Sequence, residues 1–528
     1  MSRTYRKTRS LLLGGRLAFV IAALLFLLFP PLIAALFLYH PISGDVPFGP
    51  ETRFRFSPDG KSVVFRTPDE LSVVLIYSVP VSGRTKPVLL GKQDFFVREL
   101  QISPDSRSVV FVSSEPWLRS VPLAGGTAVT LWNSGVIDLQ ISADSKIVVF
   151  RTWRKDSYDF VDLFAVPIAG GEVRQLNEIV GGGEGVVNFA ISPDGRTVVY
   201  STLEDDGRAK LVSLPIKGGV RQDLTAGLGA ALDYPIDFRI TPDSSAVVFR
   251  AIVSGEGNSL LAVPIGGGQP RLLAGPFAGQ QAVTWFEPTS DGHSVLYTLL
   301  DRSVSVDWVV LTSIPVQGGA PTKLAEANSI FAIRHTDNYV AYRTGSAQII
   351  NDYIVARSGG PARHVGGPFF CPVYRVPTCT DWQFEFTPDG RYLLFSAREN
   401  DVMHLYSTQT AGGPTRLLVA IPDDFPALDF QIAGSSKYVF FFGATAAGNS
   451  ETLLALSPEG GPPEPVVPPP AEFSGNYWGV PQFQASPIGS DVLLGARWPG
   501  EEEHKLYVAS PHIELLYDSY LPLAIRGR

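Results

Sequence analysis

The sequence Phe56-Ser57-Pro58-Asp59-Gly60, followed by Val63-Val64-Phe65, decides the fold because it returns along the whole chain. An apolar strand leads into a tight turn, and a second apolar strand follows. Proline presets φ, aspartate accepts hydrogen bonds from nearby backbone, and glycine supplies a positive φ. The turns recur at positions 59, 105, 144, 194, 243, 291, 337, 389, 435 and 489. This spacing of about 48 residues predicts ten repeats.

A second motif lies 20–27 residues after each turn and reads Val166-Pro167-Ile168-Ala169-Gly170-Gly171 in the third repeat. Each repeat therefore reads as strand, tight turn, strand, loop, strand, Gly turn, strand. Four short strands in this length are typical of a propeller blade. The composition agrees, since 51 Gly and 43 Pro among 528 residues argue against a helical protein, and 45% apolar residues argue against disorder.

Together the two motifs resemble those of the TolB-like, WD-repeat-like β-propeller family over about residues 51–528. The resemblance implies an all-β chain with a propeller of about ten four-stranded blades. Members of the family usually have six to eight blades, so ten repeats leave two arrangements open. The blades form one large ring, which the unbroken spacing favours, or two consecutive rings. The resemblance implies binding, scaffolding or enzyme-accessory roles rather than one function.

The N-terminal end predicts a membrane anchor. Residues 1–16 carry five basic side chains and no acid, and the 23 residues from Leu17 to Tyr39 carry no charge. That length spans a bilayer as a helix, and the positive-inside rule places the basic end in the cytoplasm. We therefore expect a cytoplasmic tail at 1–16, a transmembrane helix at 17–39, a linker at 40–50 and an extracytoplasmic propeller at 51–528. A cleavable signal peptide is the alternative, although its apolar region is usually shorter.

The repeat also predicts two different faces. The tight turns and the Gly turns lie on one side of a propeller, which we call the turn face. The loops between second and third strands and between blades lie on the other, which we call the loop face. The loops are longer and more varied, so we expect binding there. Because residues 41–50 extend to at most about 35 Å, we also expect the loop face to lie toward the membrane. Candidate binding residues are the tryptophans in or beside these loops: Trp117, Trp153, Trp285, Trp382, Trp478 and Trp498.

The recurring aspartates are predicted to be structural turn residues rather than metal ligands: Asp59, Asp105, Asp144, Asp194, Asp243, Asp291 and Asp389. No metal site or cofactor is expected. Calcium at the acidic loop clusters, such as Glu501-Glu502-Glu503, is the alternative, since carboxylates are its natural ligands. Cys371 and Cys379 are the only cysteines, and outside the cytoplasm they are expected to form a disulfide, with free thiols or a metal site as alternatives.

The sequence contains no nucleophile-elbow, zinc-protease, Walker or EF-hand motif. Residues 41–528 carry 38 basic and 51 acidic side chains, which argues against nucleic acid as a partner. We therefore expect a non-catalytic platform that binds a protein or peptide, with an envelope glycan as the second ligand class. The alternative is an extracytoplasmic hydrolase or lyase with its site at the mouth of the ring, because propeller enzymes draw catalytic groups from several blades.

Overall fold

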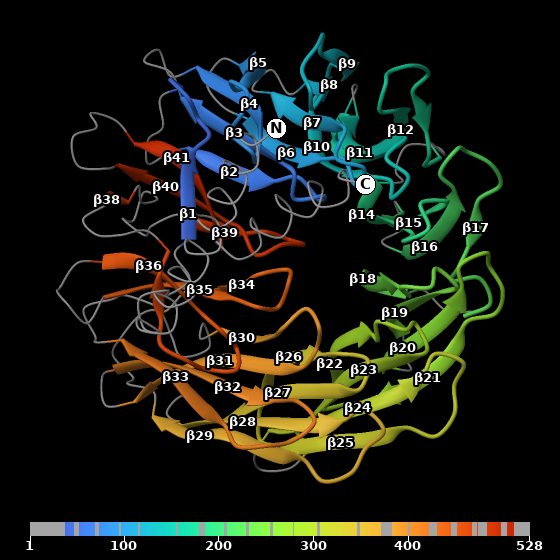
Figure 1. Cartoon of the computed structure of the whole chain (residues 1–528). Coiled ribbons are helices and arrows are strands. Elements are labelled where there is room, and N and C mark those ends of the chain that lie inside the picture. Colours follow the sequence, from blue (N-terminus) through green and yellow to red (C-terminus); the bar gives the residue numbers. More distant parts are fainter. Residues whose placement is uncertain are drawn as a thin grey trace, which may run out of the picture.

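The computed structural model describes most of the chain from Phe37 to Pro511 as one ring of antiparallel sheets around a central channel (Figure 1). The described residues are 37–46, 52–68, 73–93, 97–113, 117–154, 157–178, 185–204, 208–228, 232–253, 257–277, 279–303, 307–345, 349–370, 383–399, 402–421, 430–444, 451–466, 472–473, 483–497 and 504–511.

Each repeat folds into one blade. In blade 1 the four strands are β2 (Arg53–Phe56), β3 (Ser62–Pro68), β4 (Val74–Pro80) and β5 (Val88–Gln93), and each pairs with the next in the chain. The motif residues Val63 and Val64 lie in β3, in the middle of the blade, and both are buried. Val63 pairs with Val79, which is also buried, across the β3–β4 ladder. Successive side chains of a strand point to opposite faces of the sheet, so they pack alternately against the two neighbouring blades.

Eight more blades repeat this order from the channel outward. Blade 2 consists of β6 (Val97–Ile102), β7 (Ser108–Ser113), β8 (Leu118–Pro122) and β9 (Val129–Trp132), and blade 3 of β10 (Val136–Ile141), β11 (Ile147–Arg154), β12 (Ser157–Pro167) and β13 (Arg174–Gln175). Blade 4 consists of β14 (Gly185–Ile191), β15 (Thr197–Leu203), β16 (Ala209–Pro215) and β17 (Gln222–Asp223), and blade 5 of β18 (Leu232–Ile240), β19 (Ala246–Val253), β20 (Gly257–Pro264) and β21 (Arg271–Phe277). Blade 6 consists of β22 (Gln281–Pro288), β23 (Ser294–Asp301), β24 (Trp308–Pro315) and β25 (Thr322–Ala327), and blade 7 of β26 (Ile330–His335), β27 (Tyr339–Gly345), β28 (Ile349–Ala356) and β29 (Arg363–Phe370). Blade 8 consists of β30 (Phe384–Phe386), β31 (Tyr392–Glu399), β32 (Val402–Gln409) and β33 (Arg416–Ile421), and blade 9 of β34 (Phe430–Ile432), β35 (Val439–Ala444), β36 (Glu451–Leu456) and β37 (Glu464–Pro465).

Blade 10 joins the two ends of the described chain. Its C-terminal part consists of β38 (Glu472–Phe473), β39 (Phe483–Ala485), β40 (Val492–Arg497) and β41 (Lys505–Pro511), and its outermost strand is β1 (Phe37–Pro41), which pairs antiparallel with β41. Figure 1 shows β1 beside β41, with β2 of blade 1 next to them. The prediction of a ten-bladed propeller is confirmed, and its alternative of two consecutive rings is wrong.

The junction between blades 10 and 1, which we call the seam, is packed like any other blade junction. Ile42 is 2% exposed and lies in a cluster with Phe56, Val63 and Leu506. Its N–H donates to the Leu506 carbonyl at 2.8 Å. Nearer the channel, the Phe56 N–H donates to Gln484 Oε1 at 3.0 Å. The ring is therefore closed by both apolar burial and hydrogen bonds.

The tight turns also join neighbouring blades. In four of them serine replaces glycine as the fourth residue and takes a positive φ of 59–61°: Ser106, Ser145, Ser244 and Ser436. A left-handed serine is strained by about 1–2 kcal/mol. The left-handed conformation places the serine hydroxyl against the preceding blade. There Ser106 Oγ accepts a hydrogen bond from the Asp59 N–H at 3.0 Å, and Ser145 Oγ accepts one from the Asp105 N–H at 2.9 Å.

Apolar layers between adjacent blades make up the core, and the buried ion pair of Arg343 with Asp352 lies inside them. Arg343 and Asp352 are both 0% exposed, and their closest contact is 2.7 Å from Arg343 Nε to Asp352 Oδ1. Arg343 also lies over the Phe384 ring and donates to the Ser396 carbonyl of blade 8 at 3.4 Å. Burial raises the pKa of Asp352. The pair links blade 7 to blade 8.

The N-terminal boundary differs from the expected one. Residues 1–36, which include most of the expected span, lie outside the described residues. Residues 37–39 belong to strand β1 rather than to the end of a helix, and His40 and Pro41 belong to the same strand rather than to a linker. Within the described residues the propeller thus begins at Phe37, whereas the sequence predicts residue 51.

Every element in the described part of the chain is a strand. Among these residues the structure contains no helix that is long and apolar enough to cross a membrane.

Candidate functional site

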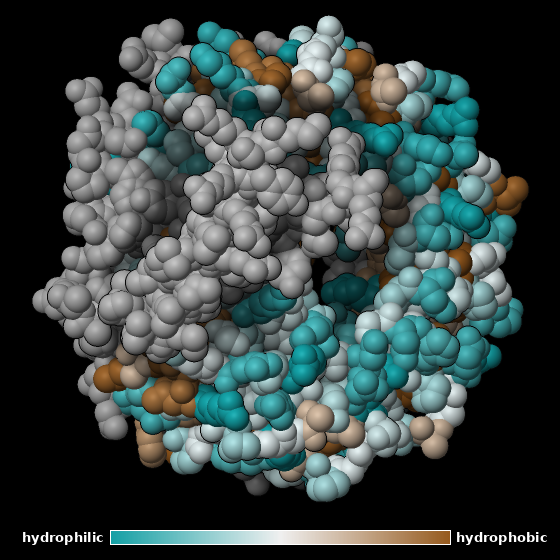
Figure 2. Space-filling model, in the orientation of Figure 1, coloured by the Kyte–Doolittle hydropathy of each residue, from teal (hydrophilic) through white to brown (hydrophobic). Residues whose placement is uncertain are grey.

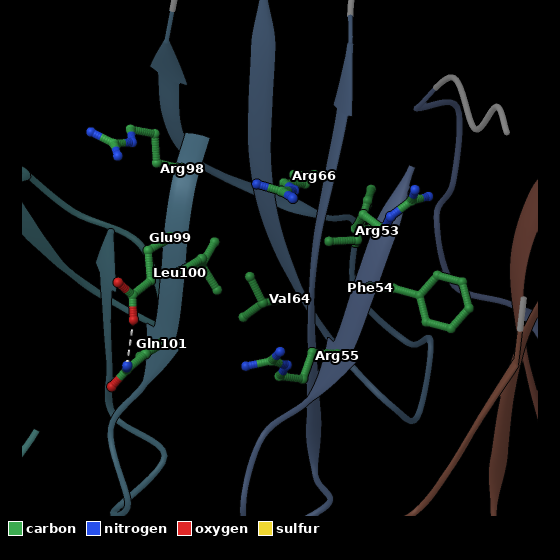
Figure 3. Close-up of a pocket in the computed structure, with 10 residues that line it drawn as sticks. Arg53, Phe54, Arg55, Val64, Arg66, Arg98, Glu99, Leu100 and Gln101 are labelled. Carbon is green, nitrogen blue, oxygen red and sulfur yellow. Dashed lines mark hydrogen bonds between the residues drawn. The ribbon is translucent and has the colours of Figure 1, made fainter. Parts of the chain in front are cut away.

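A pocket of about 370 Å3 lies between blades 1 and 2, beside the channel (Figure 3). It is lined from β2, β3 and β6, and four arginines contribute to it: Arg53, Arg55, Arg66 and Arg98. Among the described residues that line it, Glu99 is the only acidic one. Figure 3 shows the guanidinium groups of Arg55 and Arg66 directed toward the strand that carries Glu99 and Gln101.

Strand alternation places two of the arginines. Strand β2 reads Arg53-Phe54-Arg55-Phe56, and Phe54 and Phe56 pack into the seam with blade 10. Because alternate residues point to opposite faces, Arg53 and Arg55 face blade 2. Both arginines are exposed.

A β-bulge places the third. The ladder between β6 and β7 shifts register between Val97 and Glu99, so Arg98 is the extra residue. A bulge re-aims the side chain at its position, and Arg98 is exposed beside Glu99 at the pocket. Arg66 has a structural part in this arrangement, since its Nη1 donates to the Val97 carbonyl at the bulge.

Glu99 is held by its neighbour. Gln101 Nε2 donates to Glu99 Oε1 at 2.7 Å and to the Leu139 carbonyl of blade 3 at 2.9 Å. Burial raises the pKa of Glu99 above its ordinary value, and the nearby charge of Asp138 adds to this shift, although the hydrogen bond from Gln101 opposes it. Burial also lowers the pKa of Arg66, and the positive charges of Arg53 and Arg55 lower it further.

The opposite side of the channel shows how unusual this excess of positive charge is. The residue two positions before the tight turn is Arg55 in blade 1, and in blades 5 to 8 it is Arg239, Glu287, Arg334 and Glu385. These four alternate in sign around the ring, and Arg334 Nε lies 3.7 Å from Glu385 Oε2. A hydrogen bond from His335 lowers the pKa of Glu287, and the charges of Arg239 and Arg334 contribute. Charge is balanced there and unbalanced at blades 1 and 2.

The pocket has the chemistry of an anion site. Guanidinium groups bind carboxylates through paired hydrogen bonds in a fixed plane. Within the described ranges, no group of three or more His, Cys, Asp or Glu side chains is placed to hold a metal ion. Figure 2 shows hydrophilic side chains around the coloured part of the channel opening, with hydrophobic ones scattered nearer the rim.

The tryptophans expected to bind do not form one surface in the described residues. Trp153 is 44% exposed at the loop end of blade 3. Trp117 is half-buried at the loop end of blade 2, under the guanidinium of Arg119 at 5.0 Å. Trp285 lies within β22 and packs against the apolar layer between blades 6 and 7. Trp382, Trp478 and Trp498 lie outside the described residues.

All seven expected turn aspartates lie in the tight turns: Asp59, Asp105, Asp144, Asp194, Asp243, Asp291 and Asp389. At the first of these, Ser57 Oγ donates to Asp59 Oδ1 at 2.6 Å and the Lys61 N–H donates to the same oxygen at 3.1 Å. Burial acts to raise the pKa of Asp59, but these hydrogen bonds outweigh it and hold the pKa below its ordinary value. The carboxylate is thereby turned back onto its own turn.

Several other predicted features fall outside the description. Cys371 and Cys379 lie there, and so does Glu501-Glu502-Glu503. Sequence reasoning also missed the arginine pocket. The signal available was the Arg-Phe-Arg-Phe alternation directly before the first turn, because it places two arginines on one side of an inner strand.

No protein-family model matches the sequence, and no curated protein matches it. Solved structures with a similar fold include a protein described as TolB from Agrobacterium tumefaciens, which is 19% identical, with a TM-score of 0.29 over 46% of this chain and 84% of that one. Another is a eukaryotic initiation factor, 13% identical, with a TM-score of 0.46 over 71% and 90% of the two chains. A third is an oligogalacturonate lyase in complex with manganese, 14% identical, with a TM-score of 0.34 over 72% and 98%. These likenesses concern the propeller fold and identify no function.

Proposed function

We propose that this protein is a membrane-anchored β-propeller outside the cytoplasm, and that it binds an acidic segment of a protein or peptide partner without catalysis. The observation that carries the proposal is the pocket between blades 1 and 2, whose lining includes four arginines and one glutamate. The remainder of the chain beyond residue 40 is acidic, so a local excess of positive charge favours one small anionic group over a long polyanion.

The lining favours a peptide over a glycan. Sugar hydroxyls need hydrogen-bond acceptors, and the side-chain acceptors of the lining are those of Glu99 and Gln101. These two side chains are bonded to each other, and Gln101 is also bonded to Leu139. Val64 and Leu100 also line the pocket, and the half-buried Leu100 offers apolar contact. A carboxylate next to an apolar side chain matches this combination.

Anchoring and location rest on the sequence. If the span ends before β1, residues 17–36 still supply 20 uncharged residues, which is the length that a spanning helix needs. The basic residues at 1–16 then place the propeller on the opposite side of the membrane from the cytoplasm.

The proposal is tested by titrating full-length protein in detergent with a fluorescently labelled oligoglutamate peptide. A variant with Arg55→Gln and Arg98→Gln should lose about 10- to 100-fold in affinity for each arginine, because a hydrogen bond to a charged group contributes about 1.5–3 kcal/mol. A variant with Arg239→Gln and Arg334→Gln removes the same charge from the opposite side of the channel and should bind like the wild type.

Equal affinities for all three proteins would contradict the proposed site. Full displacement of the peptide by an acidic oligosaccharide at equal carboxylate concentration would contradict the choice of a peptide. Circular dichroism of each variant shows whether the propeller is folded.

A further inference from the structure

Strand β1 fixes how the chain enters the ring. Strand β40 begins at Val492 directly after the tight turn, and Val492 pairs with Ala509 near the end of β41. Phe37 pairs with Pro511 and Pro41 pairs with Tyr507. The start of β1 therefore lies at the turn face, and the strand runs from there toward the loop face.

This path reverses the expected orientation. The sequence predicts a linker at residues 40–50 that reaches the first blade from the loop side. In the structure Ile42 is buried in the seam, and Phe37, the first of the described residues, already pairs with Pro511. A membrane segment that ends at residue 36 would join the turn face with no linker between.

The turn face carries repeated basic side chains. The residue after the fourth turn position is Lys or Arg in six blades, and all six side chains are exposed: Lys61, Arg107, Lys146, Arg196, Arg391 and Lys437. In blade 3 the Lys146 side chain is 77% exposed, against 44% for Asp144. Asp144 is turned back, since its Oδ1 accepts from Ser142 Oγ at 2.7 Å and from the Lys146 N–H at 3.1 Å. At this turn the lysine is therefore the more exposed of the two charged side chains, with Lys146 Nζ 3.9 Å from Asp144 Oδ2.

We propose that the turn face lies against the membrane, with this basic ring toward anionic lipid headgroups, and that the loop face points away from the membrane. This inference rests on the anchoring in the proposed function. A basic side chain near an anionic surface contributes about 1 kcal/mol, so the ring adds to the orientation that β1 imposes. The pocket extends along β2 and β6 from Arg53 and Arg98 near the loop face to Arg55 and Gln101, two residues before the tight turns.

The test uses full-length protein reconstituted in phosphatidylcholine vesicles, with and without phosphatidylglycerol. In a background with Cys371→Ser and Cys379→Ser, a fluorophore is attached at Lys146→Cys on the turn face or at Trp153→Cys on the loop face of the same blade. Quenchers on the lipid headgroups should quench the label at position 146 and leave the label at 153 bright. Equal quenching, or stronger quenching at 153, would overturn the orientation.

Two controls separate the parts of the proposal. Protein that does not float with the vesicles after alkaline extraction would overturn the anchoring, and the orientation with it. Replacing Arg107→Gln and Arg196→Gln should reduce the gain in quenching that phosphatidylglycerol gives, whereas Arg55→Gln with Arg98→Gln should not. Equal effects of the two pairs would overturn the role of the basic ring.

Discussion

Replacing Ile42 with alanine tests the closure of the ring at a buried residue of the apolar cluster in the seam. Ile42 is 2% exposed and packs against residues of both blades, including Phe56 and Val63 of blade 1 and Leu493 and Leu506 of blade 10. A seam held by these contacts should weaken when the side chain is shortened.

The expected cost follows from the atoms removed. Alanine lacks three of the carbons of isoleucine, each buried carbon contributes about 0.8 kcal/mol, and the cavity left behind adds to this cost. We expect the opening of the seam to become easier by about 3 kcal/mol. If the amides exchange through opening of the seam, their exchange should accelerate by about 100-fold.

Hydrogen exchange with mass spectrometry measures this in peptides that cover residues 37–46 and 504–511. Leu224→Ala is the control, since Leu224 is also buried, at 0% exposure, but in blade 4. It should accelerate exchange in blades 4 and 5 and leave 37–46 unchanged. Unchanged exchange at 37–46 in Ile42→Ala would refute a ring closed by β1.

Three further outcomes are expected. Because burial holds the pKa of Glu99 above its ordinary value, Glu99 loses its negative charge before the peptide does as the pH falls. The affinity for an acidic peptide should therefore rise on acidification down to about pH 4, where the peptide itself protonates. In a pH series of titrations, Glu99→Gln should bind the peptide more tightly at neutral pH and lose this pH dependence. Gly195→Ser should be about 1 kcal/mol more stable than Gly195→Ala in chemical unfolding. A Cβ at position 195 would lie 3.5 Å from the backbone nitrogen of Asp144, so a serine hydroxyl could accept a hydrogen bond from that N–H, as the turn serines of four other blades do. Equal stabilities of the two variants would contradict the proposed role of those serines. Asp352→Asn should lower the free energy of unfolding by about 3–5 kcal/mol, because it leaves the charge of Arg343 buried without its partner. Thermal unfolding should show a smaller loss of stability for the double variant Arg343→Met with Asp352→Leu. A larger loss in the double variant than in Asp352→Asn would contradict this account.

The blades could be predicted from the sequence because their signals are local. A turn such as Ser57-Pro58-Asp59-Gly60 and the strands beside it lie within a few residues of one another, and the pattern repeats with the blade. The closure could not be predicted in this way. Strand β1 pairs with β41 across most of the chain, and Phe37-Leu38-Tyr39 continues an apolar run without any turn signal.

The pocket was hidden for a related reason. Arg55 and Arg98 belong to different repeats, and only the packing of blade 1 against blade 2 brings them to the same cavity. The bulge at Arg98 changes which way that side chain points, and a strict alternation of residues would not reveal it. Charge composition pointed the other way, since the body of the chain is acidic.

Site-specific photocrosslinking in native membranes tests the central claim most directly. A photoreactive amino acid replaces Gln101 at the pocket in one strain and Glu385, on the opposite side of the channel, in another. The account predicts a crosslinked protein or peptide partner from position 101, lost when Arg55→Gln and Arg98→Gln are added, and none from position 385. The same crosslinks from both positions, unaffected by the arginine replacements, would contradict it.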